Sequence, residues 1–208
     1  MNVPAAEALQ RLRAGNRRFV AQAAGGEVAP GARTLQLGTD RRPFAIVLGC
    51  SDARVPAEIV FDQGLGDLFV IRVAGNIVSP SQIGSVEFAA ERFGTRLVVV
   101  LGHSQCGAVA ATIEELQRPA ENQSPNLRAI VDRVRPAVEG LLNTELRQDP
   151  EALMRHAVRA NISVSVSHLR HGSYVLEKLI AGDGLAVVGA QYSVETGVVE
   201  FFDSNTQG

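Results

Sequence analysis

Two cysteines and one histidine are the residues in this sequence whose types and spacing could bind a metal ion. The cysteines are Cys50 and Cys106, and His103 lies three positions before the second of them. The His-x-x-Cys spacing is short enough for both side chains to reach one ion from a single turn. Two thiolates and one imidazole suit Zn²⁺, which favours tetrahedral sulfur and nitrogen ligation. Three protein ligands would leave a fourth position open, as in a catalytic zinc site.

Two short apolar runs must position these side chains. Phe44–Leu48 ends shortly before Cys50, and Leu97–Leu101 ends shortly before His103. Each run is nearly continuous, which predicts strands buried on both faces of a parallel sheet. Ligands of open α/β sheets bind outside the carboxyl ends of the strands, so we expect the three side chains to converge there. The spacing alone fits a reactive Cys-His pair as well as zinc, and a single buried cysteine is often only a small apolar residue.

Asp52 and Arg54 follow the first cysteine closely. An aspartate two residues from a metal ligand can bind the metal or lie just behind the ligands. An arginine two positions further on can pair with it through two parallel hydrogen bonds. Such a pair would hold Asp52 off the metal and leave the fourth position to water. The alternative is a turn stabilised by Asp52, with Arg54 in solvent.

The remaining sequence predicts one α/β domain over residues 1–208, with residues 1–40 as an N-terminal helix and arm. The fold class is a mostly parallel central sheet with an antiparallel last strand and flanking helices. The predicted helices are 5–20, 81–93 and most of 107–181, and the further strands are Leu68–Val73, Leu185–Gln191 and Val198–Phe202. Residues 23–39 are expected to form a loop or wrapping arm.

Turn and cap residues refine these boundaries. Ser79 and Ser81 are both suited to cap the helix over 81–93, and Gly94 is suited to end it. Residues 195–197, with the sequence Glu-Thr-Gly, suit a short hairpin turn between the last two strands.

The composition of the chain limits which binding partners and which cellular compartment we expect. The chain has 208 residues, 46% of them hydrophobic and 20% charged, with a net charge of −2. This near-neutral balance gives no electrostatic reason to expect nucleic acid or an anionic membrane as a partner. We see neither a secretory signal nor an apolar stretch of membrane-spanning length, so we predict a cytoplasmic protein. In a reducing compartment a structural disulfide is disfavoured, which strengthens the metal interpretation.

Three segments together resemble the β-class carbonic anhydrases. They are Gly49-Cys50-Ser51-Asp52-Ala53-Arg54-Val55-Pro56, Gly66-Asp67-Leu68-Phe69-Val70-Ile71-Arg72-Val73-Ala74-Gly75-Asn76 and Gly102-His103-Ser104-Gln105-Cys106-Gly107-Ala108. The resemblance extends from the N-terminal helix to the closing strands. It implies a lyase that hydrates CO₂ reversibly to bicarbonate and a proton, with one Zn²⁺ per chain held by Cys50, His103 and Cys106.

The resemblance also implies roles for neighbouring residues. Asp52 and Arg54 match the family's dyad, which orients a zinc-bound hydroxide for attack on CO₂, and Asp52 could become a fourth ligand at low pH. Four residues match the substrate pocket, which a partner subunit completes in part; they are Phe69, Val73, Phe88 and Gly107. Plain core packing is the alternative for Val73 and Phe88. A homodimer or larger homo-oligomer is therefore expected.

Two departures from the family pattern stand out. Many members have a glutamine nine residues before the first cysteine that contacts substrate, and this chain has Arg41 there. Some members have an inhibitory bicarbonate site with a tryptophan three residues before that cysteine, and this chain has Val47. Arg72 matches the arginine of that site but is not diagnostic alone, so we expect no regulation of that type.

Three alternatives to CO₂ hydration remain at this stage. The same scaffold could hydrolyse a related molecule such as CS₂ or COS. A zinc-stabilised dimer could bind bicarbonate or a partner without catalysis, although a purely structural site needs no dyad. A Cys-His enzyme could use a free thiolate. The glycine-bearing stretches do not fit a phosphate-binding loop, so we reject nucleotide binding.

Overall fold

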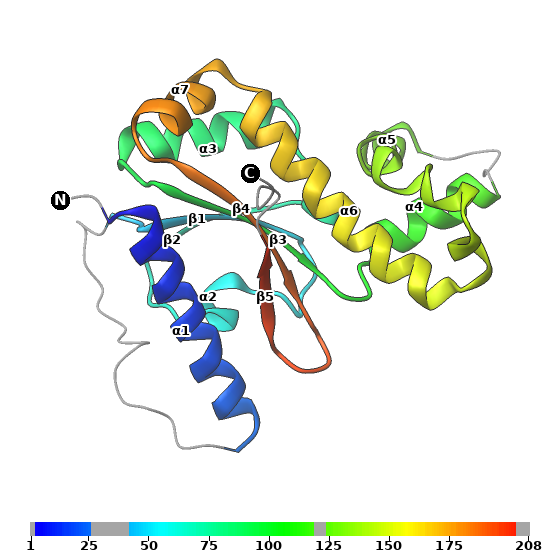
Figure 1. Cartoon of the computed structure of the whole chain (residues 1–208), viewed down its shortest axis with the longest axis horizontal. Coiled ribbons are helices and arrows are strands. Elements are labelled where there is room, and N and C mark those ends of the chain that lie inside the picture. The colour runs from blue at the N-terminus through cyan, green and yellow to red at the C-terminus, as the bar shows by residue number, and fades with distance from the viewer. Residues whose placement is uncertain (1–2, 26–41, 119–123, 203–208) are drawn as a thin grey trace.

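A computed structural model describes residues 3–25, 42–118 and 124–202. In these residues one five-stranded sheet runs in the order β2-β1-β3-β4-β5 (Figure 1). The strands are β1 (Ala45–Gly49), β2 (Leu68–Arg72), β3 (Leu97–His103), β4 (Ala186–Tyr192) and β5 (Val199–Phe202). The first four strands are parallel, and β5 pairs antiparallel with β4. The predicted fold class is confirmed.

The central strands are buried on both faces, which explains their nearly continuous apolar sequence. Every residue of β1 and of β3 is buried. Because successive side chains of a strand point to opposite faces, the two strands contribute to two separate cores. Ile46 and Leu48 belong to one core, and Ala45 and Val47 belong to the other.

One face of the sheet is covered by helices from the second half of the chain and by α3, as Figure 1 shows. These helices are α3 (Pro80–Arg92), α4 (Gly107–Gln117), α5 (Pro125–Val138), α6 (Pro150–His171) and α7 (Tyr174–Gly182). Two short 3₁₀ turns, η2 (Leu141–Asn143) and η3 (Glu145–Gln148), connect α5 to α6. The core on this face includes both cysteines, so the candidate ligands lie on the side where the crossover helices pack.

The opposite face is covered by the N-terminal helix α1 (Ala5–Ala23) and the single-turn helix α2 (Ala57–Val60). Ala8 and Leu12 of α1 are fully buried against this face. Polar groups fix the docking: the Asn16 amide nitrogen donates to the carbonyl oxygens of Val60 and Gly197, at 3.1 and 2.9 Å. Helix α1 is therefore held by directional hydrogen bonds as well as by apolar contact.

Several predicted boundaries are confirmed and several differ. Helix α3 is followed by Gly94 with φ of +68°, as the predicted stop requires. Ser79 takes the N-cap backbone position, but its side chain makes no capping hydrogen bond. Strand β3 continues two residues beyond the apolar run because Gly102 and His103 still pair with β4. The one-turn elements were not predicted because they are too short to show a periodicity.

Two predictions from the sequence concern the arm and the absence of a membrane span. Most of the predicted arm, residues 26–39, and Arg41 lie outside the described residues. Among the helices that the structure describes, none combines the length and the apolar character needed to cross a membrane.

Candidate metal centre

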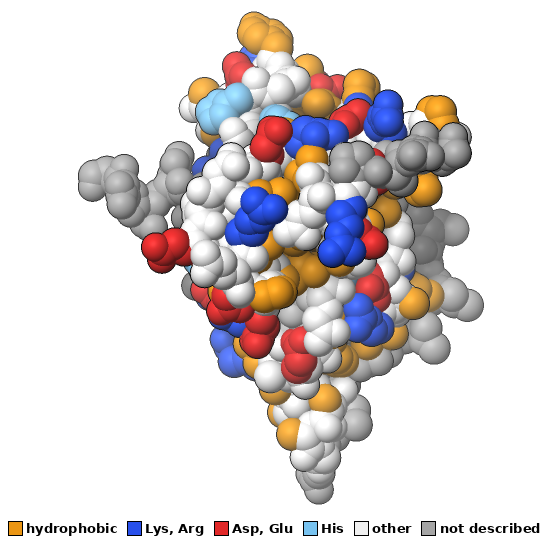
Figure 2. Space-filling view, turned by 90° about the vertical axis from the view of Figure 1, so that its right-hand side faces the viewer, with side chains coloured by type: hydrophobic (Ala, Val, Ile, Leu, Met, Phe, Trp, Pro, Cys, Tyr) orange, Lys and Arg blue, Asp and Glu red, His pale blue; other side chains and the backbone are white. Residues whose placement is uncertain are grey.

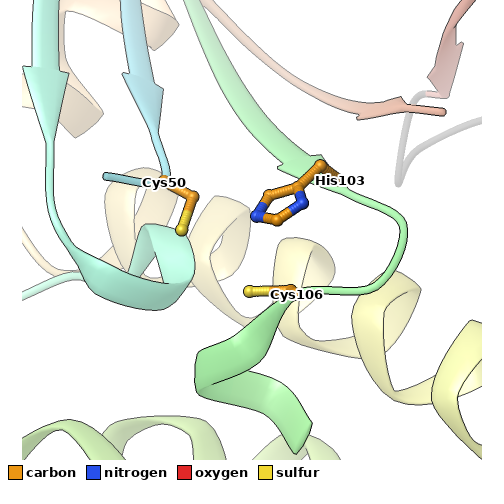
Figure 3. A group of neighbouring side chains, drawn as sticks. All are labelled: Cys50, His103 and Cys106. Atoms are coloured by element: carbon orange, nitrogen blue, oxygen red, sulfur yellow. The ribbon is translucent and has the colours of Figure 1, made fainter. Parts of the chain in front are cut away.

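The three predicted ligands converge at the carboxyl ends of two neighbouring strands. Cys50 directly follows β1, His103 is the last residue of β3, and Cys106 takes the N-cap position of α4. The two sulfur atoms and an imidazole nitrogen all lie within 4.8 Å of one another. Figure 3 shows the three side chains pointing into one common space from these separate elements. Because β1 and β3 pair directly, residues 53 positions apart are brought together.

The imidazole of His103 presents one nitrogen to this space. Its Nδ1 lies 2.8 Å from the carbonyl oxygen of Ser104. A carbonyl only accepts, so Nδ1 carries the proton and Nε2 carries the free lone pair. Nε2 is buried and has no hydrogen-bond partner in the part of the chain that the structure describes. A buried acceptor without a partner is costly, and a metal ion beside two sulfurs would satisfy it.

A 3₁₀ turn, η1 (Ala74–Asn76), lies beside the first cysteine. The N–H of Gly75 donates to the Sγ of Cys50 at 3.4 Å. Two polar side chains of α6 hold this turn: Asn161 donates to the Gly75 carbonyl at 2.7 Å, and Ser165 donates to the Asn76 carbonyl at 2.9 Å. Buried hydrogen bonds of this kind fix the geometry around the thiolate without touching an ion themselves.

The two thiols influence each other strongly. A hydrogen bond from Cys106 lowers the pKa of Cys50, and the Gly75 N–H adds to that effect. The same hydrogen bond, together with burial, raises the pKa of Cys106. The first thiolate therefore forms easily, and the second forms when a cation compensates the repulsion between two buried negative charges. This donor set, two sulfurs and one nitrogen around a shared space, fits Zn²⁺.

Asp52 and Arg54 form the predicted pair at the edge of the site. The Nε and Nη2 atoms of Arg54 donate to Oδ1 and Oδ2 of Asp52, at 3.0 and 2.9 Å. These bonds hold the pKa of Asp52 well below its usual range. Oδ2 of Asp52 lies 3.9 Å from Nε2 of His103. An ionised carboxylate therefore faces the ligand cluster while its own charge is matched by the guanidinium.

Arg72 has a structural role that the sequence did not reveal. Its Nε donates to the carbonyl oxygen of Cys50 at 3.0 Å, and its Nη2 donates to that of Asp52 at 2.5 Å. The guanidinium thus fixes the backbone of the loop that carries Cys50, a candidate ligand, and Asp52. The only signal in the sequence was the match of this position to an arginine of the family's inhibitory site.

The predicted substrate-pocket residues lie on or next to β2, α3 and α4. Phe69 and Val73 are partly buried against the core that contains the cysteines. Phe88, at 53% exposure, packs with Phe69 and Phe93 in an aromatic cluster whose ring centroids are 5.7–6.2 Å apart. Gly107 is the first residue of α4, next to Cys106. The structure thus brings Phe69 of β2 and Phe88 of α3 together.

The side of the molecule beyond α4 and α6 offers a cleft of another kind. It is lined by apolar side chains of these helices and by charged ones at the end of α4 and on η3, including Ile113, Leu153, Met154, Arg118 and Arg147. On this side, Figure 2 shows acidic and basic side chains interspersed around patches of hydrophobic ones. None of the candidate ligands lines the cleft, so we assign it no part in the metal chemistry.

Other supporting residues differ in how readily the sequence could have revealed them. Asn161 and Ser165 recur four positions apart on the buried face of a helix, a polar pattern that a periodicity analysis can find. Glu195 was predicted only as part of a hairpin turn. In the structure its carboxylate accepts hydrogen bonds from Ser104 and Gln105, which lie between two of the candidate ligands.

Known proteins match this sequence and this fold. The family model described as carbonic anhydrase matches residues 45–199. A carbonic anhydrase of Mycolicibacterium smegmatis is 38% identical over 196 residues, which cover 93% of this chain and 91% of that protein. Carbonic anhydrase 2 of Mycobacterium tuberculosis is 36% identical over 192 residues, with coverage of 91% and 89%.

Solved structures of other proteins have the same fold as this chain. A tetrameric β-carbonic anhydrase of Sordaria macrospora gives a TM-score of 0.70 at 23% identity, over 90% of this chain and 87% of that one. One from Aspergillus fumigatus gives 0.71 at 22% identity, over 95% and 86%. Since the family model covers most of the chain and a relative with 38% identity spans nearly all of it, this chain belongs to the β-class carbonic anhydrases, a family of enzymes.

Proposed function

We propose that this enzyme hydrates CO₂ reversibly to bicarbonate and a proton, with one zinc ion held by Cys50, His103 and Cys106. The observation that carries the proposal is the buried, unpartnered Nε2 of His103, grouped with two sulfurs within 4.8 Å. When bound, zinc would supply a Lewis acid that lowers the pKa of water to about 7.

Asp52 orients the attacking water in this proposal. Its carboxylate is ionised and faces the ligand cluster, so an Oδ atom can accept a hydrogen bond from the water and aim a lone pair at CO₂. Arg54 holds the carboxylate through two parallel hydrogen bonds, which keep it from taking a ligand position. At low pH protons compete with hydroxide for the fourth metal position, and under that condition closure of the site by Asp52 stays part of the proposal. The pair therefore acts through geometry and charge rather than by forming a covalent intermediate.

The substrate pocket is proposed to lie beside β2. Phe69, Val73 and Phe88 supply apolar surface there, and the backbone N–H of Gly107 is a donor for an oxygen of the substrate. The half-exposed Phe88 supports a pocket that a second subunit completes. We accordingly propose a single-domain protein that forms a homodimer or larger homo-oligomer in the cytoplasm.

A joint measurement of metal and activity tests the function. We expect one zinc per chain by elemental analysis, and CO₂ hydration by stopped flow that increases as the pH rises through the pKa of the bound water. Full activity in protein stripped of metal would contradict the proposal. Parallel assays with CS₂ and COS distinguish the related hydrolases, and light scattering tests the oligomer, since a fully active monomer would overturn a pocket completed by a partner.

Thiolate catalysis is the second candidate, because hydrogen bonding lowers the pKa of Cys50. It predicts that the metal-free protein reacts with thiol-modifying reagents and turns over a substrate in the presence of a chelator. Stoichiometric zinc that protects both cysteines from modification would exclude it.

A further inference from the structure

The two-residue loop between His103 and Cys106 contains one residue in an unfavourable backbone conformation. Gln105 has φ of +55°, in the left-handed region that residues other than glycine adopt at a cost. The backbone turns here from the end of β3 into α4 within three residues. Strained conformations persist where surrounding contacts hold them in place. The contacts that hold this loop therefore also affect the positions of His103 and Cys106 at its two ends.

The carboxylate of Glu195 binds both loop residues at once. The hydroxyl of Ser104 donates to Oε2 at 2.7 Å, and the side-chain amide of Gln105 donates to Oε1 at 2.6 Å. The hydroxyl of Ser193 adds a third hydrogen bond, to Oε2, at 2.9 Å. These donors lower the pKa of Glu195 to about 2, with Ser104 as the largest cause. The anchor is thus ionised, and charge-assisted hydrogen bonds of this type are the stronger ones.

Ser104 links this anchor to the imidazole. Its carbonyl oxygen accepts the hydrogen bond that fixes Nδ1 of His103. Its N–H donates to the carbonyl of Tyr192 at 2.9 Å, and its hydroxyl accepts from the N–H of Val194 at 3.0 Å. The residue that orients the histidine is therefore fastened to the β4–β5 hairpin at three points, one of which is Glu195.

The hairpin itself is rigidly held. The N–H of Gly197 donates to the carbonyl of Ser193 at 2.9 Å, closing the turn. Asn16 of α1 donates to the carbonyl of Gly197 and accepts from the N–H of Val199, at 2.9 and 2.8 Å. Glu195 is exposed, but it stands on a turn that is tied to both α1 and the sheet. A carboxylate on such a base can transmit a fixed position to the loop that it binds.

We propose that Glu195 is a positioning residue for the metal: its carboxylate holds the Ser104–Gln105 loop so that His103 and Cys106 face one ion. This inference rests on the proposed zinc site and adds to it a residue that lies 89 positions from the nearer ligand along the chain. Its effect is expected on the rate at which zinc leaves, because a loosened loop lets one ligand depart while the other two remain.

The test compares Glu195→Gln with Glu200→Gln, a matched control on the same hairpin. Glu200 is also exposed, and its carboxylate pairs with Arg159 at 3.2 Å, away from the loop. Purified zinc-loaded proteins are mixed with excess chromogenic chelator, and zinc release is followed by absorbance. We expect about tenfold faster release from Glu195→Gln, the lower end of the effect of residues behind metal ligands, and an unchanged rate from Glu200→Gln.

A second pair of measurements separates positioning from general stability. Cobalt-substituted proteins report ligand geometry through their visible spectrum, which we expect to change in Glu195→Gln and not in Glu200→Gln. Gln105→Met removes one of the two loop contacts while keeping side-chain size. Its effect on zinc release should be non-additive with Glu195→Gln, since both changes break the same link.

The outcomes distinguish this inference from the function on which it depends. Wild-type protein that takes up no zinc defeats the proposed function itself. Wild-type protein with stoichiometric zinc, but equal release rates and spectra in both variants, overturns the role of Glu195 alone. Equal acceleration in Glu195→Gln and Glu200→Gln also overturns it, because that result indicates general loosening of the hairpin.

Discussion

Two aspartate–arginine pairs flank helix α2, and they differ in almost everything except residue type. Asp52 and Arg54 are two positions apart, with side chains 21% and 49% exposed. Asp62 and Arg18 are 44 positions apart, joined at 2.7 Å, with side chains 3% and 35% exposed. The first pair faces the candidate metal ligands, and the second joins the segment after α2 to α1 on the other face of the sheet.

The difference shows that the burial and surroundings of an aspartate–arginine pair decide whether it serves function or stability. In the exposed pair the arginine fixes a carboxylate that the proposed function needs ionised and accessible, and such pairs add little to stability. In the buried pair the carboxylate is removed from water, so loss of either partner leaves a charge poorly compensated. We therefore expect changes in the first pair to affect turnover and changes in the second to affect stability.

The largest effect is expected from a substitution that removes a candidate zinc ligand. In Cys106→Ser a hydroxyl replaces a thiolate ligand, so zinc binding and CO₂ hydration should be lost together. The loss should exceed the roughly 10–100-fold that residues behind the ligands contribute. Elemental analysis and stopped-flow assays check it, with circular dichroism to establish that the protein is folded. Activity retained without metal would show that Asp52 and Arg54 serve another chemistry.

The first pair is tested directly by Asp52→Asn. The amide keeps the shape but lacks the charge that orients the water, so we expect turnover to fall about 100-fold with zinc content unchanged. Urea unfolding should change by less than about 1 kcal/mol, because the pair is partly in water. Ser51→Ala, an exposed change next to it, is the control for local disturbance. An unchanged rate across pH would rule out the role of Asp52.

The second pair is tested by Asp62→Asn. The change weakens a buried hydrogen bond to a charged group, so we expect a loss of about 1–3 kcal/mol in the free energy of unfolding. Zinc content and turnover of the folded protein should stay the same. The matched control is Asp132→Asn, which breaks an exposed pair with Arg135 and should cost less than about 1 kcal/mol. A strong loss of turnover would show that α1 docking and catalysis are coupled.

The smallest effect concerns a third carboxylate, Glu195, which is held by neutral donors instead of an arginine. Its pKa falls from 4.5 to about 2 on folding, so its contribution to stability is complete above about pH 5. The contribution is lost as the pH falls toward 2. With a chelator present in both samples, the difference in urea midpoint between wild type and Glu195→Gln should be constant at pH 5–8 and shrink below that range. A difference that widens in acid would contradict this assignment.

The sequence allowed correct predictions for those features that depend on short-range patterns of residues. The continuous apolar runs indicated strands buried on both faces, because parallel sheets covered by helices require them. Gly94 indicated the end of α3, because a left-handed residue there favours glycine. Cys50, His103 and Cys106 could be grouped because ligands gather at the carboxyl ends of neighbouring parallel strands.

The sequence by itself determined the fold class and the three candidate ligand types, and it offered the local pairing of Asp52 with Arg54 as one of two interpretations. Only the tertiary structure decided that Arg18 reaches Asp62, that Asn161 supports the turn beside Cys50, and that Glu195 holds the loop between His103 and Cys106. The physical reason is range. Backbone preferences and side-chain spacing act over a few residues, whereas these contacts join segments 44 to 90 positions apart and exist only once the sheet and its helices have packed.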